Sequence, residues 1–491
     1  MLFITQNLLL YVLVFPIIGI LCLILIPSRE KRLLKFIALN FTSFSFIGSL
    51  ILWGSFTKFS GSFQFLIKLT WFPLLTLNFT FGIDGISLFF IFLTTLLIPL
   101  CILSSWNSIS HSLKEFLISF LFLNFLLIGV FCVLDLLFFY IFFESVLIPM
   151  FLIVGIWGSR ERKILASYYF FLYTLLGSVV MLLAILYILE QVGTTDYEIL
   201  LTFSFSEIEQ KFLWFSFFLS FSSKIPMIPV HLWLPEAHVE APTSGSVILA
   251  GVLLKLGIYG FIRFSLPLFS QASFFFAPLV YFISAMGIIY TSFTAIRQTD
   301  FKRIIAYTSI AHMNLVMLGI FSFNSIGIEG AIFQSLSHGF VASSLFLLIG
   351  IVYDRYRTRL IQYYGGLAIM MPIYVSIFLF FTMANIGLPG TSNFVGEFLI
   401  LAGSFKVNTS ITFLGATGMI VGSMYSLWLF NRISYGNLKI QYTTYFLDIS
   451  FLEFIVFLPL LSGTFFTGLY PNVFLSFMHM SVNNIIELLY F

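Results

Sequence analysis

The stretch that decides the fold is FLSFSSKIPMIPVHLWLPEAH, residues 218–238. Lys224 stands in the middle of an apolar run, and Pro226 and Pro229 follow it closely. Proline removes a helical hydrogen bond and obstructs the preceding turn, so the sequence predicts that the helix carrying Lys224 is interrupted here. An ammonium group in an apolar setting is costly, and its role depends on the solvent around it.

The rest of the chain is built for a lipid solvent. Its 491 residues are 60% hydrophobic and only 9% charged, whereas soluble domains carry about 25% charged residues. Apolar runs of about 20 residues, the length that crosses a bilayer core, recur from end to end. They are too continuously apolar for barrel strands, in which apolar and polar positions alternate. The sequence therefore predicts an all-α polytopic membrane protein.

The apolar runs indicate about fourteen transmembrane helices. The expected spans are 8–26, 36–53, 86–103, 116–134, 136–157, 166–189, 212–230, 244–261, 274–296, 304–321, 330–351, 371–394, 411–430 and 451–469. The last stretch, 471–491, is expected either to form an interfacial amphipathic helix or to lie along a neighbouring chain. Asp84 and Asp135 fall at span ends and are expected to cap or to be solvated.

The basic residues test this map. With the N-terminus outside, 16 of the 23 Lys and Arg fall on one side, five fall on the other, and Lys224 and Lys255 lie inside spans. The five are Lys58, Lys68, Lys211, Arg263 and Lys406. This bias follows the positive-inside rule and supports both the span count and the orientation. The net charge of +3 is therefore explained by topological anchors, and no nucleic-acid partner is expected.

Cofactor motifs are absent from the sequence. The three cysteines, Cys22, Cys101 and Cys132, are isolated in apolar runs, and no C-x-x-C is present to hold zinc or an iron–sulfur cluster. No G-x-G-x-x-G follows a strand, and no Walker motif occurs. Histidines inside spans leave haem ligation open in principle, but nothing else in the sequence favours it. No cofactor or metal is expected on this chain.

The segment HLWLPEAHVEAPTSG follows the interrupted helix. Glu236, His238 and Glu240 are metal-ligand types, but their spacing lacks the two-histidine helical pattern of zinc proteases. A structural loop at the basic-side surface is the preferred interpretation. His231 lies closer in sequence to Lys224 and is a candidate for a role beside that lysine.

Ionisable residues inside the spans are the main candidates for function. Lys224 and Lys255 lie about 18 and 17 Å into their runs at 1.5 Å per residue, close to the midplane of a core about 30 Å thick. Both are too deep to reach an interface cheaply, and intramembrane ionisable groups are functional by default. Glu144 lies inside a span as well. His312 and His338, each about 12 Å deep, serve either as proton carriers or as hydrogen-bonded packing residues.

A second helix break resembles the first. In ANIGLPGTSNFVGE, Pro389 stands between two glycines and precedes Glu397. Two interrupted spans at corresponding places in two halves indicate an inverted-repeat transporter. The expected organisation is one membrane domain, 1–491. It divides into N-terminal helices 1–112, a first five-helix repeat 113–265, a second 274–432, and C-terminal helices 433–491.

Several motifs carry a family resemblance that covers nearly the whole chain. They are FGIDGIS, FFESVLIPMFLIVGIWG, SSKIPMIPVHLWLPEAHVEAPTSGSVILAGVLLKLGIYG, DFKRIIAYTSIAHMN and FQSLSHGF. The chain resembles the subunit 4 family of NADH dehydrogenase, the antiporter-like membrane subunits of respiratory complex I. Its 66 phenylalanines and its length look most like land-plant mitochondrial forms. The resemblance implies fourteen helices, of which the seventh and twelfth are discontinuous.

The resemblance also implies function, setting and site residues. It implies a proton-translocating subunit of the mitochondrial inner membrane, driven from a distance by ubiquinone reduction. NADH, FMN, iron–sulfur clusters and ubiquinone would be bound by other subunits. The implied partners are other complex I membrane subunits, including subunits 2 and 5, and lipids such as cardiolipin. The family's proton-path residues fall on Glu144, Lys224, His231, Lys255, His312, His338 and Glu397.

The chemistry of these residues suits a proton path. An apolar site disfavours the ammonium form of lysine, and a nearby carboxylate opposes that effect. If Glu144 pairs with Lys224, the lysine holds its proton; if the carboxylate moves away or is neutralised, the lysine releases it. Lys255 would be the central relay and Glu397 the terminal group toward the outside, with the histidines as shuttles.

Two other function classes remain open. One is an autonomous cation/proton antiporter, although two central lysines repel Na⁺ and K⁺ and suit protons better. The other is a structural membrane subunit with vestigial charges, which predicts that charge-neutral variants pump normally.

Overall fold

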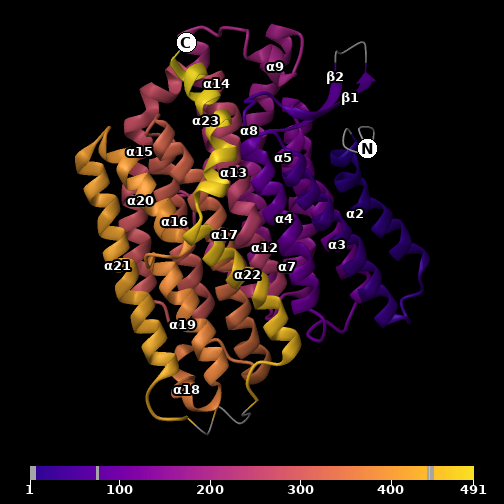
Figure 1. The fold of residues 1–491 in the computed structure, drawn as a ribbon, viewed down its shortest axis with the longest axis vertical. Coiled ribbons are helices and arrows are strands. Elements are labelled where there is room, and N and C mark those ends of the chain that lie inside the picture. Colours follow the sequence, from indigo (N-terminus) through magenta and orange to yellow (C-terminus); the bar gives the residue numbers. More distant parts are fainter. Residues whose placement is uncertain (1–6, 73–76, 440–441, 443–446, 491) are drawn as a thin grey trace.

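The computed structural model describes residues 7–72, 77–439, 442 and 447–490. Figure 1 shows a bundle whose helices run mostly along the long axis, with connecting segments gathered at the two ends. Within the described residues, thirteen helices are long and apolar enough to cross a membrane, and two shorter apolar helices accompany them. The predicted all-α polytopic fold is confirmed.

The helices follow one another up and down the bundle. The first half contains α2 (Leu8–Leu25), α3 (Lys31–Ser55), α4 (Gly85–Ser104), α5 (Leu113–Cys132), α6 (Leu136–Ser145), α7 (Leu147–Trp157), α8 (Lys163–Val192), α9 (Tyr197–Leu200), α10 (Glu207–Lys224), α11 (Trp233–Glu240), α12 (Thr243–Ile248), α13 (Leu254–Gly260) and α14 (Leu266–Leu268). The second half contains α15 (Ser270–Ile296), α16 (Phe301–Ile320), α17 (Ser325–Tyr356), α18 (Leu367–Met370), α19 (Pro372–Ile386), α20 (Ser392–Phe405), α21 (Thr409–Ser434), α22 (Phe451–Leu469) and α23 (Asn472–Tyr490).

Both predicted helix breaks are present. α10 ends at Lys224 and α11 begins only at Trp233, so the backbone leaves the helix across the two prolines. α19 ends at Ile386, and Gly387 and Gly390 adopt left-handed conformations with φ of 84° and 91° before α20 starts. A residue with a Cβ is strained at such φ values, which explains the glycines. The expected surface loop after the first break is wrong, because residues 233–240 form a helix and most of its side chains are buried.

The helix that carries Lys255 is longer than expected. It runs from Thr243 to Leu268 instead of ending at 261. Every residue of its 18-residue apolar stretch is buried within the protein. Two π-helical stretches, Leu249–Leu253 and Phe261–Ser265, interrupt its α-helical geometry on either side of α13. π-turns inside helices frequently mark functional sites. Lys255 therefore stands near the centre of a fully buried helix, between two irregular stretches.

A two-stranded hairpin at the upper end in Figure 1 was not anticipated by the sequence analysis. β1 (Gln64–Phe72) pairs antiparallel with β2 (Leu77–Ile83). β2 leads directly into Asp84, the N-cap of α4, whose carboxylate accepts from the Ser87 backbone N–H at 2.9 Å. Asp135 caps α6 in the same way through the backbone N–H groups of Leu137 and Phe138. The expected capping roles are confirmed.

The two halves run in opposite directions. α5 begins at the lower end in Figure 1 and finishes beside the hairpin, whereas α15 begins at the upper end after α14. In each half the fourth membrane crossing is the broken one. This agrees with the inverted-repeat interpretation, although the boundaries 113–265 and 274–432 stay predictions.

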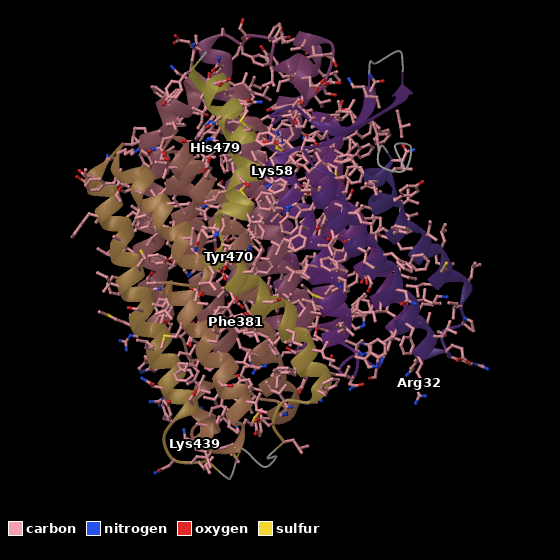
Figure 2. All side chains as sticks on the ribbon, in the orientation of Figure 1. Arg32, Lys58, Phe381, Lys439, Tyr470 and His479 are labelled. Atoms are coloured by element: carbon pink, nitrogen blue, oxygen red, sulfur yellow. The ribbon has the colours of Figure 1, made fainter. Side chains whose placement is uncertain are left out.

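Charged side chains mark the two ends. Arg32 and Lys439 lie toward the lower end in Figure 2, and Lys58 and His479 lie in the upper half. Some of the counted anchors are buried instead: the Arg263 side chain is only 4% exposed and is paired with Asp84 at 2.6 Å. Arg263 is therefore a core residue of the upper half and not a surface anchor.

The C-terminal helix α23 packs on its own chain. The backbone N–H of Gly85 donates to Ser481 Oγ at 3.0 Å, and the Tyr490 hydroxyl donates to the Phe323 carbonyl at 3.3 Å. His479 Nδ1 lies 2.6 Å from Glu329 Oε1 at the start of α17. α23 therefore joins the upper ends of α4, α16 and α17.

Candidate functional site

A buried lysine and a buried histidine meet at the centre of the bundle. Lys255 Nζ lies 3.0 Å from His338 Nδ1 of α17 and also donates to the Ala250 carbonyl. Lys255 is completely inaccessible to solvent and His338 is 1% exposed. The lysine therefore has one polar contact on its own helix and one with a helix of the second half of the protein.

Two glycines let these helices approach. A Cβ on Gly339 would lie 3.3 Å from the Gly251 carbonyl oxygen, and a Cβ on Gly251 would lie 3.9 Å from the Gly339 carbonyl oxygen. Gly339 is adjacent to His338, and Gly251 is one helical turn before Lys255. Small residues at helix crossings allow main chains to come close in membranes. The crossing places Lys255 and His338 within hydrogen-bonding distance.

The polar line continues from His338 into α16 and α20. The rings of His338 and His312 have centroids 5.6 Å apart. His312 Nδ1 lies 3.3 Å from Glu397 Oε1, and Gln334 Nε2 donates to the same oxygen at 3.3 Å. Four candidates from four different helices thus follow one another in space: Lys255, His338, His312 and Glu397.

A small cavity opens at the far end of this line. Its volume is about 30 Å³, and it is lined by Ile288, Ala311, His312, Leu315, Asn385, Ile386, Glu397, Gly415, Gly418, Met419, Gly422 and Tyr425. A void of about 10–15 Å³ with polar walls is enough for one water molecule. His312, Asn385 and Glu397 supply polar groups, so the cavity suits water that accepts or supplies protons at Glu397.

Glu144 and Lys224 form a second group in the first half. Lys224 Nζ lies 4.5 Å above the ring of Phe143, the neighbour of Glu144, and the two charges act on each other electrostatically. Lys224 Nζ and both Glu144 oxygens are buried without a hydrogen-bond partner among the described residues, so the two side chains do not bond to each other directly. The aromatic ring supplies part of the stabilisation that the carboxylate would give.

The lysine group adjoins the central lysine through tight helix packing. A Cβ on Gly257 would lie 2.6 Å from Ile225 Cγ1 and 2.8 Å from the Phe221 carbonyl oxygen. Gly257 is two residues from Lys255, and Ile225 follows Lys224. The end of α10 therefore rests directly on α13, although the two ammonium groups have no common hydrogen-bond partner among the described residues.

His231 lies apart from these groups. Its ring faces Tyr290 of α15, with centroids 5.8 Å apart. The predicted role beside Lys224 is untested, and the ring contact points to the lower half of α15 instead.

Two functional candidates escaped the sequence analysis. His238 of α11 is fully buried, stacks on Phe346 with centroids 4.5 Å apart, and interacts electrostatically with Lys255 and Lys302. Lys302, which the charge count treated as a surface anchor, is 2% exposed and donates to the Ala241 carbonyl at 2.8 Å. The usable signal was that Lys302 lies on the same helix as His312, α16.

The carboxylates of α11 are used in ion pairs. Arg303 lies 2.6 Å from Glu236, and Arg359 lies 3.5 Å from Glu240. These pairs tie α11 to α16 and to the segment after α17. Among the described residues, no group of three or more His, Cys, Asp or Glu is arranged to hold a metal ion.

Comparisons with known proteins agree on one family. The model for the NADH:quinone oxidoreductase/Mrp antiporter transmembrane region matches residues 133–424, and the model for the amino terminus of NADH-ubiquinone oxidoreductase chain 4 matches residues 31–134. NADH-ubiquinone oxidoreductase chain 4 of Arabidopsis thaliana is 57% identical over 96% of this chain and 95% of its own length. The Chondrus crispus protein of the same name is 58% identical, with 96% of each chain covered.

Solved structures have the same fold. A chain of respiratory complex I from Thermus thermophilus with bound NADH superimposes with a TM-score of 0.88 at 29% identity, covering 98% of this chain and 99% of that one. A chain of the membrane-bound sulfane sulfur reductase, an archaeal respiratory membrane complex, gives a TM-score of 0.84 at 21% identity and shares the fold. Matches to both halves of the chain, with near-complete coverage, place it in the NADH-ubiquinone oxidoreductase chain 4 family, the antiporter-like membrane subunits of respiratory complex I.

Proposed function

We propose that this chain carries protons across the membrane as a core subunit of NADH:ubiquinone oxidoreductase, with the redox reactions taking place on other subunits. The observation that carries the proposal is the line Lys255–His338–His312–Glu397, which joins four helices through the buried centre of the bundle. Intramembrane ionisable residues in contact with one another form proton relays. Burying ionisable groups inside the membrane costs free energy, and such groups are therefore usually functional.

Each member of the line has a chemical task. Lysine and glutamate store and release protons, while an imidazole accepts at one nitrogen and donates from the other. His338 receives from Lys255 at Nδ1, and its Nε2 has no hydrogen-bond partner among the described residues, which leaves it for transfer toward His312. Glu397 collects the proton, and the cavity beside it supplies water for release.

The Glu144–Lys224 group is the switch of the first half. With no direct ion pair formed, the lysine relies on the Phe143 ring and is poised to give up its proton. Movement of Glu144 toward Lys224 would retain the proton. A neighbouring subunit that biases the position of this carboxylate would thereby control transfer.

Uptake from the basic side runs through His238. This ring stands in electrostatic contact with Lys302 near the lower end and with Lys255 at the centre. His231 is the alternative uptake group, on the α15 side.

The cellular setting follows from the family. The relatives are named as NADH-ubiquinone oxidoreductase chain 4 and include those of land plants. The proposed location is the mitochondrial inner membrane. The proposed partners are complex I membrane subunits, including subunits 2 and 5, and phospholipids such as cardiolipin. NADH, FMN, iron–sulfur clusters and ubiquinone belong to the other subunits.

An autonomous cation/proton antiporter is the second candidate, because one matching family description includes Mrp antiporters. Such a protein needs a site that holds a metal cation against its hydration shell. In the described line Glu397 is the single carboxylate, and Lys255 lies beside the histidines. Cation-driven exchange by the isolated chain in liposomes would favour this candidate.

Replacing Lys224 with methionine tests the proposed function. We expect proton pumping by the assembled complex in vesicles to fall by about tenfold or more, because a positioned acid–base group is removed from the path. Pumping and NADH oxidation should be measured together, after a native gel confirms assembly. The Lys211→Met variant is the matched control, since Lys211 lies on the same helix and also sits over a phenylalanine ring, at 4.4 Å from Phe275. Normal pumping by the Lys224 variant would reject its place in the path.

A further inference from the structure

The outer half of the central helix carries a polar ladder that the proton path does not use. Lys255, Tyr259 and Arg263 follow at intervals of four residues, and Arg263 Nε donates to the Tyr259 hydroxyl at 3.2 Å. Residues four apart lie on one face of a helix. The helix that carries the ladder runs through α13 and α14 toward the end of the bundle with the hairpin (Figure 1). The charge count assigns fewer basic residues to that side.

This ladder would be a shorter way out than the observed line. A proton on Lys255 would need to pass only Tyr259 to reach the outer end of the helix. The line through His338 instead turns sideways and crosses three further helices. Something in the outer half must therefore prevent the direct route.

Arg263 closes the top of the ladder. Its guanidinium lies 2.6 Å from Asp84, and both side chains are less than 5% exposed. Arginine does not release its proton in proteins, so it cannot relay one. Its fixed positive charge in a low-dielectric site repels hydronium strongly.

Aromatic rings surround the guanidinium. Its central carbon lies 4.9 Å from the ring centre of Phe63, 5.8 Å from that of Tyr197 and 5.4 Å from that of Tyr259. Phe63 immediately precedes the hairpin, and Tyr197 begins α9, so two outer segments cover the charge. The rings stabilise the cation and leave little space for a chain of water molecules.

Tyr259 is also a dead end for a proton. Its hydroxyl donates to the Phe131 carbonyl at 3.1 Å and accepts from Arg263. A backbone carbonyl cannot pass a proton onward, and the arginine donor blocks the acceptor side. Both hydrogen-bonding directions of this hydroxyl are occupied by groups that end the route.

We propose that Arg263, held by Asp84 and covered by Phe63, Tyr197 and Tyr259, is an electrostatic seal that keeps Lys255 out of contact with the outer side and forces protons sideways to Glu397. The proposal rests on the proposed proton-translocating function. It also gives the hairpin and α9 a role: they hold the cover of the seal.

Removing both charges of the pair tests the seal. The variant Asp84→Asn/Arg263→Met keeps a good helix N-cap in asparagine and leaves no unpaired buried charge. A second variant, Arg263→Gln, removes the cation while its amide can still donate to Asp84. The measurement is the passive proton leak after an acid pulse outside vesicles that contain the assembled complex without NADH. We expect a several-fold faster leak in either variant, and a lower steady pH difference during NADH oxidation.

Two controls separate a seal from a structural pair. Arg263→Lys keeps the positive charge and should leak less than Arg263→Gln, although lysine, unlike arginine, can release its proton. Lys68→Met/Glu198→Gln removes an exposed outer ion pair at 3.9 Å and should not leak. If an assembled charge-free variant leaks no faster than the unchanged complex, the seal is rejected; Arg263→Gln decides the matter if the double variant does not assemble.

A third variant distinguishes failure of the seal from failure of the proposed function. Adding Lys255→Met to the leaking variant should stop the leak, because the leak passes through Lys255. If Lys255→Met alone abolishes pumping while the charge-free variants do not leak, only the seal is wrong. If Lys255→Met pumps normally, the proposed function itself is wrong.

Discussion

Proton pumping is expected to be lost entirely when Lys255 is replaced by methionine. Lys255 Nζ is the described hydrogen-bonding partner of His338 Nδ1, so its loss interrupts the proposed line at its first step. Methionine has similar length and is tolerated in a buried setting, so the complex should still assemble. The measurement is proton uptake into vesicles per NADH oxidised, together with the oxidation rate. Electron transfer coupled to pumping should fall as well.

Lys255→Arg makes this prediction specific to proton transfer. Arginine keeps the positive charge but does not release a proton, so this variant should fail to pump just as the methionine variant does. Recovery of pumping with arginine would mean that only the charge at this position matters. Reduction of a soluble electron acceptor by NADH should be normal in both variants, because the proposed function assigns that reaction to other subunits.

Assembly of the complex is expected to fail when Gly85 is replaced by valine. A Cβ at this position would lie 2.0 Å from the Phe477 carbonyl oxygen and 3.1 Å from Ser481 Oγ. The nearest atom is backbone, so no side-chain rotation relieves the clash and α23 must move as a whole. Overpacking typically costs about 1–3 kcal/mol, and more when backbone must shift. The amount of intact complex on a native gel should drop to a small fraction.

The matched control is Gly54→Val in α3, where a Cβ would meet nothing within 4 Å. This variant should assemble normally. Limited proteolysis should also cleave the C-terminal helix of any Gly85→Val protein that does accumulate, since the helix loses its contact with α4. Normal assembly together with a protected α23 would show that this docking is unimportant.

The sequence was most informative where a residue type has a single structural consequence. Prolines beside Lys224 allowed only a broken helix, and the Gly387–Gly390 segment predicted the second break in the same way. Buried charges near a bilayer midplane indicated function because their cost is high. The carboxylates at 84 and 135 were correctly expected at helix starts.

Other features depend on which surfaces meet in space, and a single sequence does not contain that information. The strand QFLIKLTWF is a short, mostly apolar segment that sequence alone does not distinguish from a membrane-facing segment. The hairpin was therefore missed. Lys302 and Arg263 look like surface anchors until helix packing buries them. The pairing of Gly251 with Gly339 is one of many possible contacts among 33 glycines. The loop expected around His238 was wrong because Glu236 and Glu240 of that segment pair with arginines distant in sequence, which allows the segment to be buried as a helix.

The crossing of Gly251 and Gly339 has a consequence for the speed of the central step. Side chains carried on mobile segments spend much of their time beyond hydrogen-bonding distance, and proton transfer between them occurs only when they come close. Here two main chains rest against each other, so donor and acceptor stay at reacting distance between turnovers. Holding reactants in place removes the entropic part of the barrier. In the proposed path, the step from Lys255 to His338 would then be limited by the supply of protons and by the electric field across the membrane.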